Sequence, residues 1–231
     1  MTVYGIVGMM DELRYPQFER PASAGNGKTL LLTHFLYQEF IHKNRPVIAN
    51  FHVYYKGGKT SGQSWATYMS SQEIFDRWFD DDLEGSIIGI TELQSLLNSA
   101  GRQAKMITYI EKCLNQRRKS DYDLVWDSQR WGSVDKRLRD VTDELYQPMK
   151  WHCYFDEDSQ SWRVTYPCPK DRCSERHMIS VHREIPQPET DEDRLYPLYF
   201  LNSWEIGELY NTKEKMRDVL SYNPAWDTAT T

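Results

Sequence analysis

Long apolar runs, cysteines and a surplus of positive charge are all scarce in this sequence. No stretch reaches the roughly 18 consecutive apolar residues of a membrane-spanning helix, so we expect no membrane span. The 231 residues contain only four cysteines, too few for a disulfide scaffold in a chain of this length. The N-terminus lacks the basic and apolar regions of a secretory signal. Together these absences predict an intracellular, cytoplasmic protein in a reducing compartment.

Positive charge is gathered in one segment rather than spread over the chain. The net charge is −6, which argues against a generally basic, nucleic-acid-binding surface. Residues 117–139, however, hold seven Lys or Arg residues against four Asp. This segment forms either a local basic edge that contacts phosphate groups or an ordinary solvated charged face. The sequence alone leaves both interpretations open.

The most specific motif in the sequence is divided into two parts. Residues 8–10 and 25–29 would together read G-M-M-G-N-G-K-T, the G-x-x-x-x-G-K-[ST] pattern of a phosphate-binding loop. Residues 11–24 stand between the two parts as an insertion within the loop. An apolar segment, 3–7, precedes the motif, and a leucine-rich segment, 30–41, follows it. Because a phosphate loop joins a strand to a helix, we expect the two parts to lie side by side, with the insertion as an outward excursion.

The residue types of this motif suit the binding of a nucleoside triphosphate. Backbone N–H groups of such a loop surround the phosphates, and the N-terminus of the following helix adds a partial positive charge. Lys28 would reach the β- and γ-phosphates of ATP, and the Thr29 hydroxyl would bind Mg²⁺. The remaining phosphate-binding positions are Gly8, Gly25, Asn26 and Gly27. The alternative is an ordinary Gly-Asn-Gly turn before a helix.

Strand-like and helix-like segments alternate over the first 150 residues. Apolar runs predict strands at 3–7, 47–50, 86–90 and 123–127. Helix-like runs between them predict helices at 30–42, 71–79 and 105–118. Ser70 and Glu73 have the spacing of a capping box at the start of the second helix. This alternation predicts an α/β domain, residues 1–150, with a mainly parallel sheet flanked by helices.

The pattern changes after Pro148. Alternating segments at 151–155 and 162–166 flank an acidic turn and predict a β-hairpin, with a further strand at 178–184. We therefore expect a small β-rich appendage over residues 151–185. The remaining residues, 186–231, would pack back on the core and include a helix at 212–220.

A second motif follows the apolar strand 87–90. P-loop ATPases of the additional-strand type have Asp-Glu at this place, where the Asp anchors Mg²⁺ and the Glu polarises the attacking water. This chain has Thr91 and Glu92 instead, so Glu92 is the candidate catalytic carboxylate and Thr91 a neutral, weaker partner for hydrated Mg²⁺. Asp127, on the next predicted strand, is an alternative source of the missing carboxylate. The alternative is that this segment has no catalytic role and is an ordinary buried strand followed by an exposed Glu.

A third polar group, Asp127-Ser128-Gln129-Arg130, ends the next predicted strand. A polar side chain at the tip of a strand between the phosphate-loop strand and the Glu92 strand can sense the γ-phosphate, and Gln129 fits that role. Arg130 is either an arginine finger that reaches a neighbouring subunit or part of the basic edge.

These motifs together resemble a known family. The divided phosphate loop, then I-I-G-I-T-E, then D-S-Q-R and V-D-K-R-L-R-D occur in an order similar to that of the zonula occludens toxin-like branch of the FtsK/HerA ATPases. The resemblance covers roughly residues 1–150 and the short element 210–212. It implies a RecA-like P-loop NTPase fold, a homo-oligomeric ring, and ATP with Mg²⁺ as cofactors. It also implies movement of single- or double-stranded DNA during virion packaging or extrusion, in the host cell of a virus or plasmid.

The resemblance also implies roles for individual residues. Lys28 matches the phosphate-binding lysine and Thr29 the Mg²⁺-binding hydroxyl, while Glu92 matches the catalytic glutamate and Gln129 the sensor. Arginine fingers in such rings act on the neighbouring subunit, and the candidates are Arg117, Arg118, Arg130 and Arg137. The insertion and Thr91 depart from the family pattern and leave two hypotheses. One is an active DNA-translocating or packaging ATPase, and the other is a degenerate relative that binds nucleotide or DNA as a non-hydrolysing scaffold or assembly factor.

Cysteine and histidine residues gather around the predicted hairpin. Cys153 and its neighbour His152, either of which could supply one ligand, lie on its first strand, and Cys168, Cys173 and His177 follow its second strand. Four nitrogen or sulfur ligands in a tetrahedron bind Zn²⁺, and a small β appendage often needs such a staple. Free thiols in a hairpin are the alternative interpretation.

If four of these residues bind zinc, purified protein should contain about one zinc ion per chain. Replacing Cys168 and Cys173 by Ser should remove the metal, because thiolates are the ligands that hold zinc in structural sites. Elemental analysis measures the zinc content of both proteins. Wild-type protein that contains no zinc, although it was never exposed to a chelator, would contradict the site.

Overall fold

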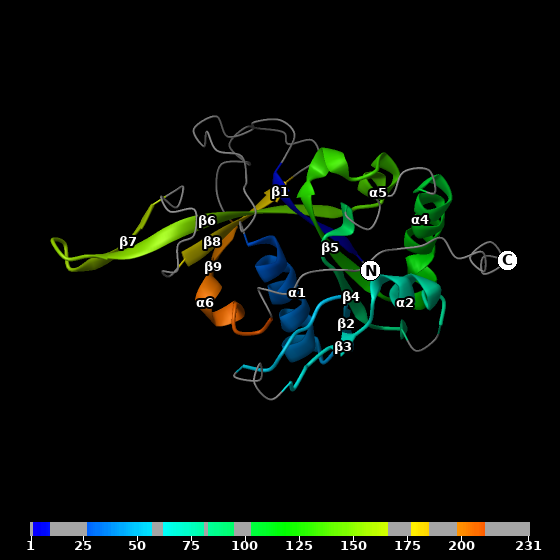
Figure 1. The fold of residues 1–231 in the computed structure, drawn as a ribbon, viewed down its shortest axis with the longest axis horizontal. Coiled ribbons are helices and arrows are strands. Elements are labelled where there is room, and N and C mark those ends of the chain that lie inside the picture. The colour runs from blue at the N-terminus through cyan, green and yellow to red at the C-terminus, as the bar shows by residue number, and fades with distance from the viewer. Residues whose placement is uncertain are drawn as a thin grey trace.

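The computed structural model describes residues 2–9, 27–56, 62–80, 83–94, 103–165, 177–184 and 198–210. These residues form a nine-stranded sheet with helices on both faces (Figure 1). The strands are β1 (Val3–Met9), β2 (Val47–Ala49), β3 (Thr67–Tyr68), β4 (Ile87–Ile90), β5 (Asp123–Arg130), β6 (Glu144–Asp156), β7 (Ser161–Thr165), β8 (His177–Glu184) and β9 (Tyr199–Asn202). The helices include α1 (Lys28–Lys43), α2 (Ser71–Asp76), α4 (Gln103–Ser120), α5 (Lys136–Asp140), α6 (Ser203–Ile206) and the 3₁₀ turn η2 (Trp131–Ser133).

The strand order confirms the predicted α/β fold with a mainly parallel sheet. The order is β3-β2-β4-β5-β1-β6-β8-β9, and β7 also pairs with β6. The pairs from β3 to β6 are parallel, whereas β7, β8 and β9 are added in antiparallel pairs. As expected, β5 lies between β1 and β4, the strands that lead to the phosphate-binding residues and to Glu92.

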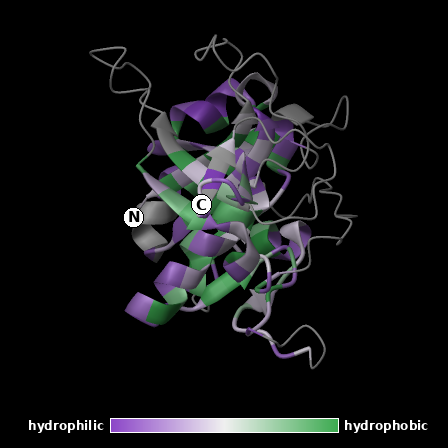
Figure 2. Ribbon diagram, turned by 90° about the vertical axis from the view of Figure 1, so that its left-hand side faces the viewer, coloured by the Kyte–Doolittle hydropathy of each residue, from purple (hydrophilic) through white to green (hydrophobic). Residues whose placement is uncertain are grey.

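Neighbouring residues of the central strands face opposite sides of the sheet and belong to two separate cores. On one face, α1 and α6 pack against side chains that include Ile6, Val47, Ile87 and Val125. On the other face, α2, α4 and α5 pack against side chains that include Val7, Ile48, Ile88 and Leu124. Burial on both faces explains why these strands read as continuous apolar runs in the sequence. Figure 2 shows the same distribution, with hydrophobic residues concentrated in the strands and hydrophilic residues along the outer helices.

The helix starts agree with local sequence signals. Ser70 and Glu73 form the predicted capping box: the Ser70 hydroxyl accepts from the Glu73 N–H, and the Glu73 carboxylate accepts from the Ser70 N–H. The helix that follows ends at Asp76, earlier than the predicted Phe79.

Strand β5 is longer than the sequence pattern predicts. It runs on to Arg130, so that Gln129 lies within the strand instead of after it.

The predicted hairpin shares a strand with the core. Strand β6 has 13 residues: Glu144–Tyr146 pair in parallel with β1, and His152–Asp156 pair with β7. The strand therefore runs through residue 150, where the sequence pattern placed a boundary. The hairpin of β6 and β7 projects from the body of the molecule (Figure 1).

The described part of the C-terminal segment, residues 198–210, lies against the core. Strand β9 pairs with β8, and α6 packs near α1. The Tyr54 N–H donates to the Leu209 carbonyl at 2.7 Å, and Val53 pairs with Tyr210 in an isolated bridge. The helix expected at 212–220 lies outside the described residues. Among the described residues, no helix combines the length and the hydropathy needed to cross a bilayer.

Gly89 allows strand β4 to approach helix α1 closely. A Cβ atom at this position would lie 2.5 Å from Leu36 Cδ1 and 3.3 Å from Leu32 Cδ2. Both leucines are fully buried, so neither side chain has free space into which it can move. Only glycine fits at this point of the strand.

Gly89→Ala should therefore lower the free energy of unfolding by about 1–3 kcal/mol, the usual cost of overpacking a core. Urea denaturation measures the change. A double-mutant cycle combines this change with Leu36→Ala. The losses of stability in the two single variants should sum to more than the loss in the double variant, because shortening Leu36 relieves the clash with the new Cβ atom. Additive costs would show that the packing of β4 on α1 does not depend on this contact.

Candidate functional site

The predicted site residues lie where the carboxyl ends of β1, β4 and β5 meet the N-terminus of α1. Gly8 lies near the end of β1, and Lys28 and Thr29 are in the first turn of α1. Thr91 and Glu92 directly follow β4, and Gln129 is in the last part of β5. The carboxyl edge of a parallel sheet is the usual place for ligands in α/β proteins.

Helix α1 begins after a glycine in a left-handed conformation. Gly27 precedes the helix with φ 94°, a left-handed conformation that favours glycine. A Cβ atom on Gly27 would also lie 2.9 Å from Ile179 Cδ1 of β8. No side chain caps this helix among the described residues, so its N-terminus keeps N–H groups for a ligand.

The two parts of the divided motif are in contact at one described point. A Cβ atom on Gly8 would lie 3.0 Å from the Gln129 carbonyl oxygen and 3.2 Å from Lys28 Cδ. Gly8 therefore packs against the Lys28 side chain. This close packing favours glycine, the residue without a side chain, at position 8. Gly25, Asn26 and the insertion 11–24 lie outside the described residues, so the outward excursion stays a prediction.

The Asp127 carboxylate is the centre of the site's hydrogen-bond network. Its Oδ2 accepts from the Thr29 hydroxyl at 3.0 Å and from the Thr91 hydroxyl at 2.9 Å. Its Oδ1 accepts from the Glu92 N–H at 2.7 Å. The carboxylate thus joins α1, β5 and the residues that follow β4.

Asp127 is fully buried, and this burial raises its pKa above the ordinary value. The positive field of Lys28 and the hydrogen bonds from Glu92, Thr91 and Thr29 lower the pKa in part. All three hydrogen-bond donors found in the described ranges are neutral groups, so no cation of those ranges bonds this carboxylate directly.

A second chain of contacts connects the predicted catalytic residues. The buried Lys28 ammonium donates to Gln129 Oε1 at 3.0 Å, and Gln129 Nε2 donates to Glu92 Oε1 at 3.4 Å. Glu92 has φ 57°, an uncommon conformation for a residue with a side chain, and its N–H bond to Asp127 holds it there. The structure therefore brings Lys28, Gln129 and Glu92 together.

Asn50 completes the hydrogen-bond network around Asp127, and this role was not predicted from the sequence. Its Oδ1 accepts from the Thr91 N–H at 2.8 Å, and its Nδ2 donates to the Thr91 carbonyl at 3.3 Å and to Ser71 Oγ at 3.0 Å. These bonds fix the backbone of Thr91 from strand β2. The available signal was a polar residue at the end of the predicted buried strand 47–50, but without the strand order nothing linked Asn50 to Thr91.

The two arginine candidates with described side chains, Arg130 and Arg137, make no described contact with this network. The Arg130 side chain is exposed at the end of β5. Arg137 donates to the Asp135 carboxylate at 3.1 Å and to the Thr108 hydroxyl at 2.9 Å. The side chains of Arg117 and Arg118 lie outside the described residues.

The predicted zinc ligands are only partly described. Cys153 is buried on β6, and the backbone of His177 on β8 pairs with that of the buried His152. Cys168, Cys173 and the side chain of His177 lie outside the described residues. Within the described ranges, no three His, Cys, Asp or Glu residues are grouped for a metal. Zinc binding stays a prediction.

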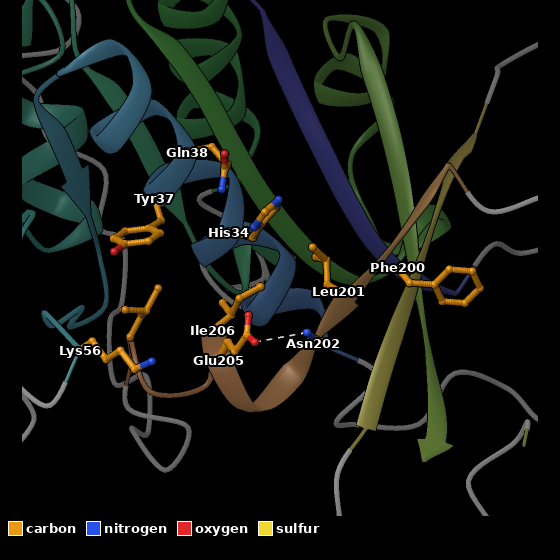
Figure 3. A pocket seen from close by; sticks show the side chains of 10 residues that line it. His34, Tyr37, Gln38, Lys56, Phe200, Leu201, Asn202, Glu205 and Ile206 are labelled. Atoms are coloured by element: carbon orange, nitrogen blue, oxygen red, sulfur yellow. Dashed lines mark hydrogen bonds between the residues drawn. The ribbon is translucent and has the colours of Figure 1, made fainter. Parts of the chain in front are cut away.

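A separate cavity of about 390 Å³ lies between α1 and the β9–α6 segment (Figure 3). Its lining includes His34, Tyr37, Lys56 and Glu205, and Asn202 donates to the Glu205 carboxylate at 3.3 Å. It shares no lining residue with the Asp127 network. Burial lowers the pKa of His34, which favours its neutral form.

Comparison with known proteins gives a likeness in fold. No family model and no curated protein matches this sequence. The N-terminal domain of zonular occludens toxin from Neisseria meningitidis aligns with a TM-score of 0.50 and 14% identity, over 91% of this chain and 100% of that domain. In fold, this chain is similar to that toxin domain. At this identity, the likeness to the toxin domain concerns the fold alone.

The genome packaging NTPase B204 from Sulfolobus turreted icosahedral virus 2 also aligns with this chain. Its complex with ATP-gammaS matches at a TM-score of 0.45 and 11% identity, over 72% of this chain and 97% of B204. Its complex with AMP matches at a TM-score of 0.43 and 12% identity, with the same coverage.

Because the folded protein binds the Asp127 proton more tightly than the unfolded chain does, ionisation of Asp127 costs stability as pH rises above its ordinary pKa. Asp127→Asn should therefore raise the melting temperature of the nucleotide-free protein at pH 7. The gain should fade as pH falls toward about 4, the ordinary pKa of Asp. Thermal unfolding at a series of pH values measures the difference.

Asp123→Asn is a control of opposite sign. Burial opposes the shift, but hydrogen bonds from Arg45 and the Thr2 N–H lower the pKa of Asp123. Asp123 therefore adds stability above the ordinary Asp pKa, and replacing it should lower the melting temperature at pH 7. A loss of stability in Asp127→Asn at neutral pH would contradict the assigned cost of the buried charge.

Proposed function

We propose that this protein is a P-loop ATPase that binds ATP with Mg²⁺ and uses its hydrolysis to move DNA, in genome packaging or morphogenesis of a virus or plasmid. The observation that carries the proposal is the meeting of Lys28, Thr29, Glu92 and Gln129 at the carboxyl edge of the sheet. The sequence places these residues as much as 101 positions apart, and the fold brings them into one hydrogen-bonded group.

The residues present fit Mg²⁺, which prefers oxygen ligands. The Thr29 and Thr91 hydroxyl oxygens lie 3.4 Å apart, and Asp127 Oδ2 lies 3.0 and 2.9 Å from them. When bound with nucleotide, Mg²⁺ neutralises charge on the transferred phosphoryl group. The Thr29 hydroxyl and a neighbouring oxygen, from Thr91 or Asp127, would hold the Mg²⁺ ion.

Each remaining side chain has a role in this proposal. Lys28 binds the β- and γ-phosphates and gives up its bond to Gln129 when they arrive. Gln129, released from Lys28, contacts the γ-phosphate, while Glu92 orients the attacking water. The free N–H groups at the start of α1 bind phosphate oxygens.

The DNA-moving part of the proposal rests on the motif resemblance, from Gly8 to the V-D-K-R-L-R-D segment. A homo-oligomeric ring with DNA as partner belongs to the same inference. In such a ring Arg130, which is exposed at the end of β5, would be a candidate to reach a neighbouring subunit. A non-hydrolysing scaffold is the second candidate, because the insertion and Thr91 depart from the family pattern.

Lys28→Ala should weaken ATP binding at least about tenfold, because it removes the cation that contacts the phosphates. Glu92→Gln should keep ATP binding but lower turnover by about 100- to 10,000-fold, since the amide cannot accept a proton from water. Titration with a fluorescent ATP analogue and steady-state hydrolysis, each with and without double-stranded DNA, measure the two effects.

Lys43→Ala is the matched control, because Lys43 lies at the other end of α1 with its side chain 61% exposed and paired to Glu39. It should leave both binding and turnover unchanged. Wild-type protein that binds ATP but never hydrolyses it, even with DNA, would favour the scaffold. Turnover that is unaffected by Lys28→Ala would remove this site from the mechanism.

A further inference from the structure

The missing carboxylate after β4 has a neighbour on β5 that is suited to replace it. Ile90 and Trp126 are partners in the parallel register of β4 and β5, so Thr91 and Asp127 are the next positions on adjacent strands. A single step sideways in the sheet thus separates the neutral residue from an acidic one. The Thr91 hydroxyl donates to Asp127 at 2.9 Å, which confirms that the two side chains meet.

We propose that Asp127 on β5 is the acidic anchor for Mg²⁺, and that Thr91 positions this carboxylate instead of acting as a weak anchor itself. The inference rests on the proposed function, because it assumes nucleotide binding at Lys28 and Thr29. Its geometric basis is the 3.0 Å hydrogen bond between Asp127 and Thr29, the residue whose hydroxyl meets Mg²⁺ in P-loop sites. An acidic residue next to that hydroxyl is next to the ion.

A purely structural role explains this arrangement less well. A carboxylate that is fully buried among neutral donors costs free energy, and a neutral residue of the same shape would avoid that cost. The surroundings also hold the carboxylate in place: the Thr91 hydroxyl donates to its Oδ2, and Asn50 bonds both the N–H and the carbonyl of Thr91. Such support of a ligand by its neighbours is typical of metal sites.

Asp127 also connects the metal site to the catalytic glutamate. Its Oδ1 bonds the Glu92 N–H while its Oδ2 bonds the Thr29 hydroxyl. Asp127→Asn removes the charge and keeps an oxygen for the Glu92 N–H. Its amide NH₂ group replaces Oδ2, so the Thr29 and Thr91 hydroxyls would accept from this group instead of donating to it. This variant therefore separates the charge of Asp127 from its bond to the Glu92 N–H.

The experiment measures metal binding without turnover. Mn²⁺ binding is followed by electron paramagnetic resonance in the presence of ATP-γ-S, and affinity for a fluorescent ATP analogue is measured in EDTA and in Mg²⁺. Asp127→Asn should lower Mn²⁺ affinity by about 10- to 100-fold, as changes close to a metal site do. Its nucleotide affinity in EDTA should stay within about twofold of wild type, because Lys28 and the α1 N-terminus remain.

The double variant Thr91→Asp/Asp127→Asn moves the carboxylate back to β4 and should restore part of the Mn²⁺ affinity. Thr91→Asp alone should bring no gain, because a second carboxylate would face Asp127. The exposed Asp140→Asn is the matched control and should bind Mn²⁺ as wild type does. Thermal unfolding of each variant shows that it is folded.

The outcomes separate this inference from the proposed function. Wild-type protein that binds no nucleotide, with or without metal, would overturn the proposed function itself. Nucleotide binding that depends on Lys28, together with unchanged Mn²⁺ affinity in Asp127→Asn, would overturn only the inference. Equal weakening with and without metal, with no rescue in the double variant, would assign Asp127 a structural role and also overturn it.

Discussion

The site depends on the hydrogen bonds that the buried Asp127 carboxylate accepts. This carboxylate bonds Thr29 at the start of α1, Thr91 after β4 and the backbone of Glu92, while its own strand, β5, lies between β1 and β4. Because the charge is fully buried, these bonds must all be made for the carboxylate to be tolerated. The same interaction therefore sets the positions of the helix start, the second motif and the catalytic candidate relative to one another.

Around this fixed centre lies a set of contacts that a ligand can exchange. Lys28 bonds Gln129, and Gln129 bonds Glu92, so these three side chains form one hydrogen-bonded chain. In the proposed function, phosphate oxygens would compete for Lys28, and the Gln129 side chain would then be free to turn toward the γ-phosphate. The network through Asp127 and the one through Gln129 share Glu92. In the proposed function, this shared residue would connect metal binding to the orientation of water.

Local signals predicted much of the fold because they act over a few residues. The capping box at Ser70, the apolar strands and the Gly27-Lys28 start of α1 all depend on neighbours in the chain. Longer-range features were less accessible. Strand β6 joins the core to the hairpin across residue 150 because Glu144–Tyr146 pair with β1, some 140 residues earlier, while Leu145–His152 pair with β8. No local pattern records either pairing. Asn50 escaped notice for the same reason, since its partner Thr91 is 41 positions away.

By itself, the sequence determined which chemical groups are available and in what order: a glycine–lysine–threonine helix start, a glutamate after one strand, and a glutamine at the end of the next. Periodicity and turn signals act locally, and they were enough to place these groups at strand and helix ends. The tertiary structure decided which groups share a site and which carboxylate faces Thr29. Sheet register made that decision, because it pairs Ile90 with Trp126 and so sets Asp127 beside Thr91. Hydrogen bonds between neighbouring strands depend on three-dimensional proximity, which the chain acquires only when the sheet forms.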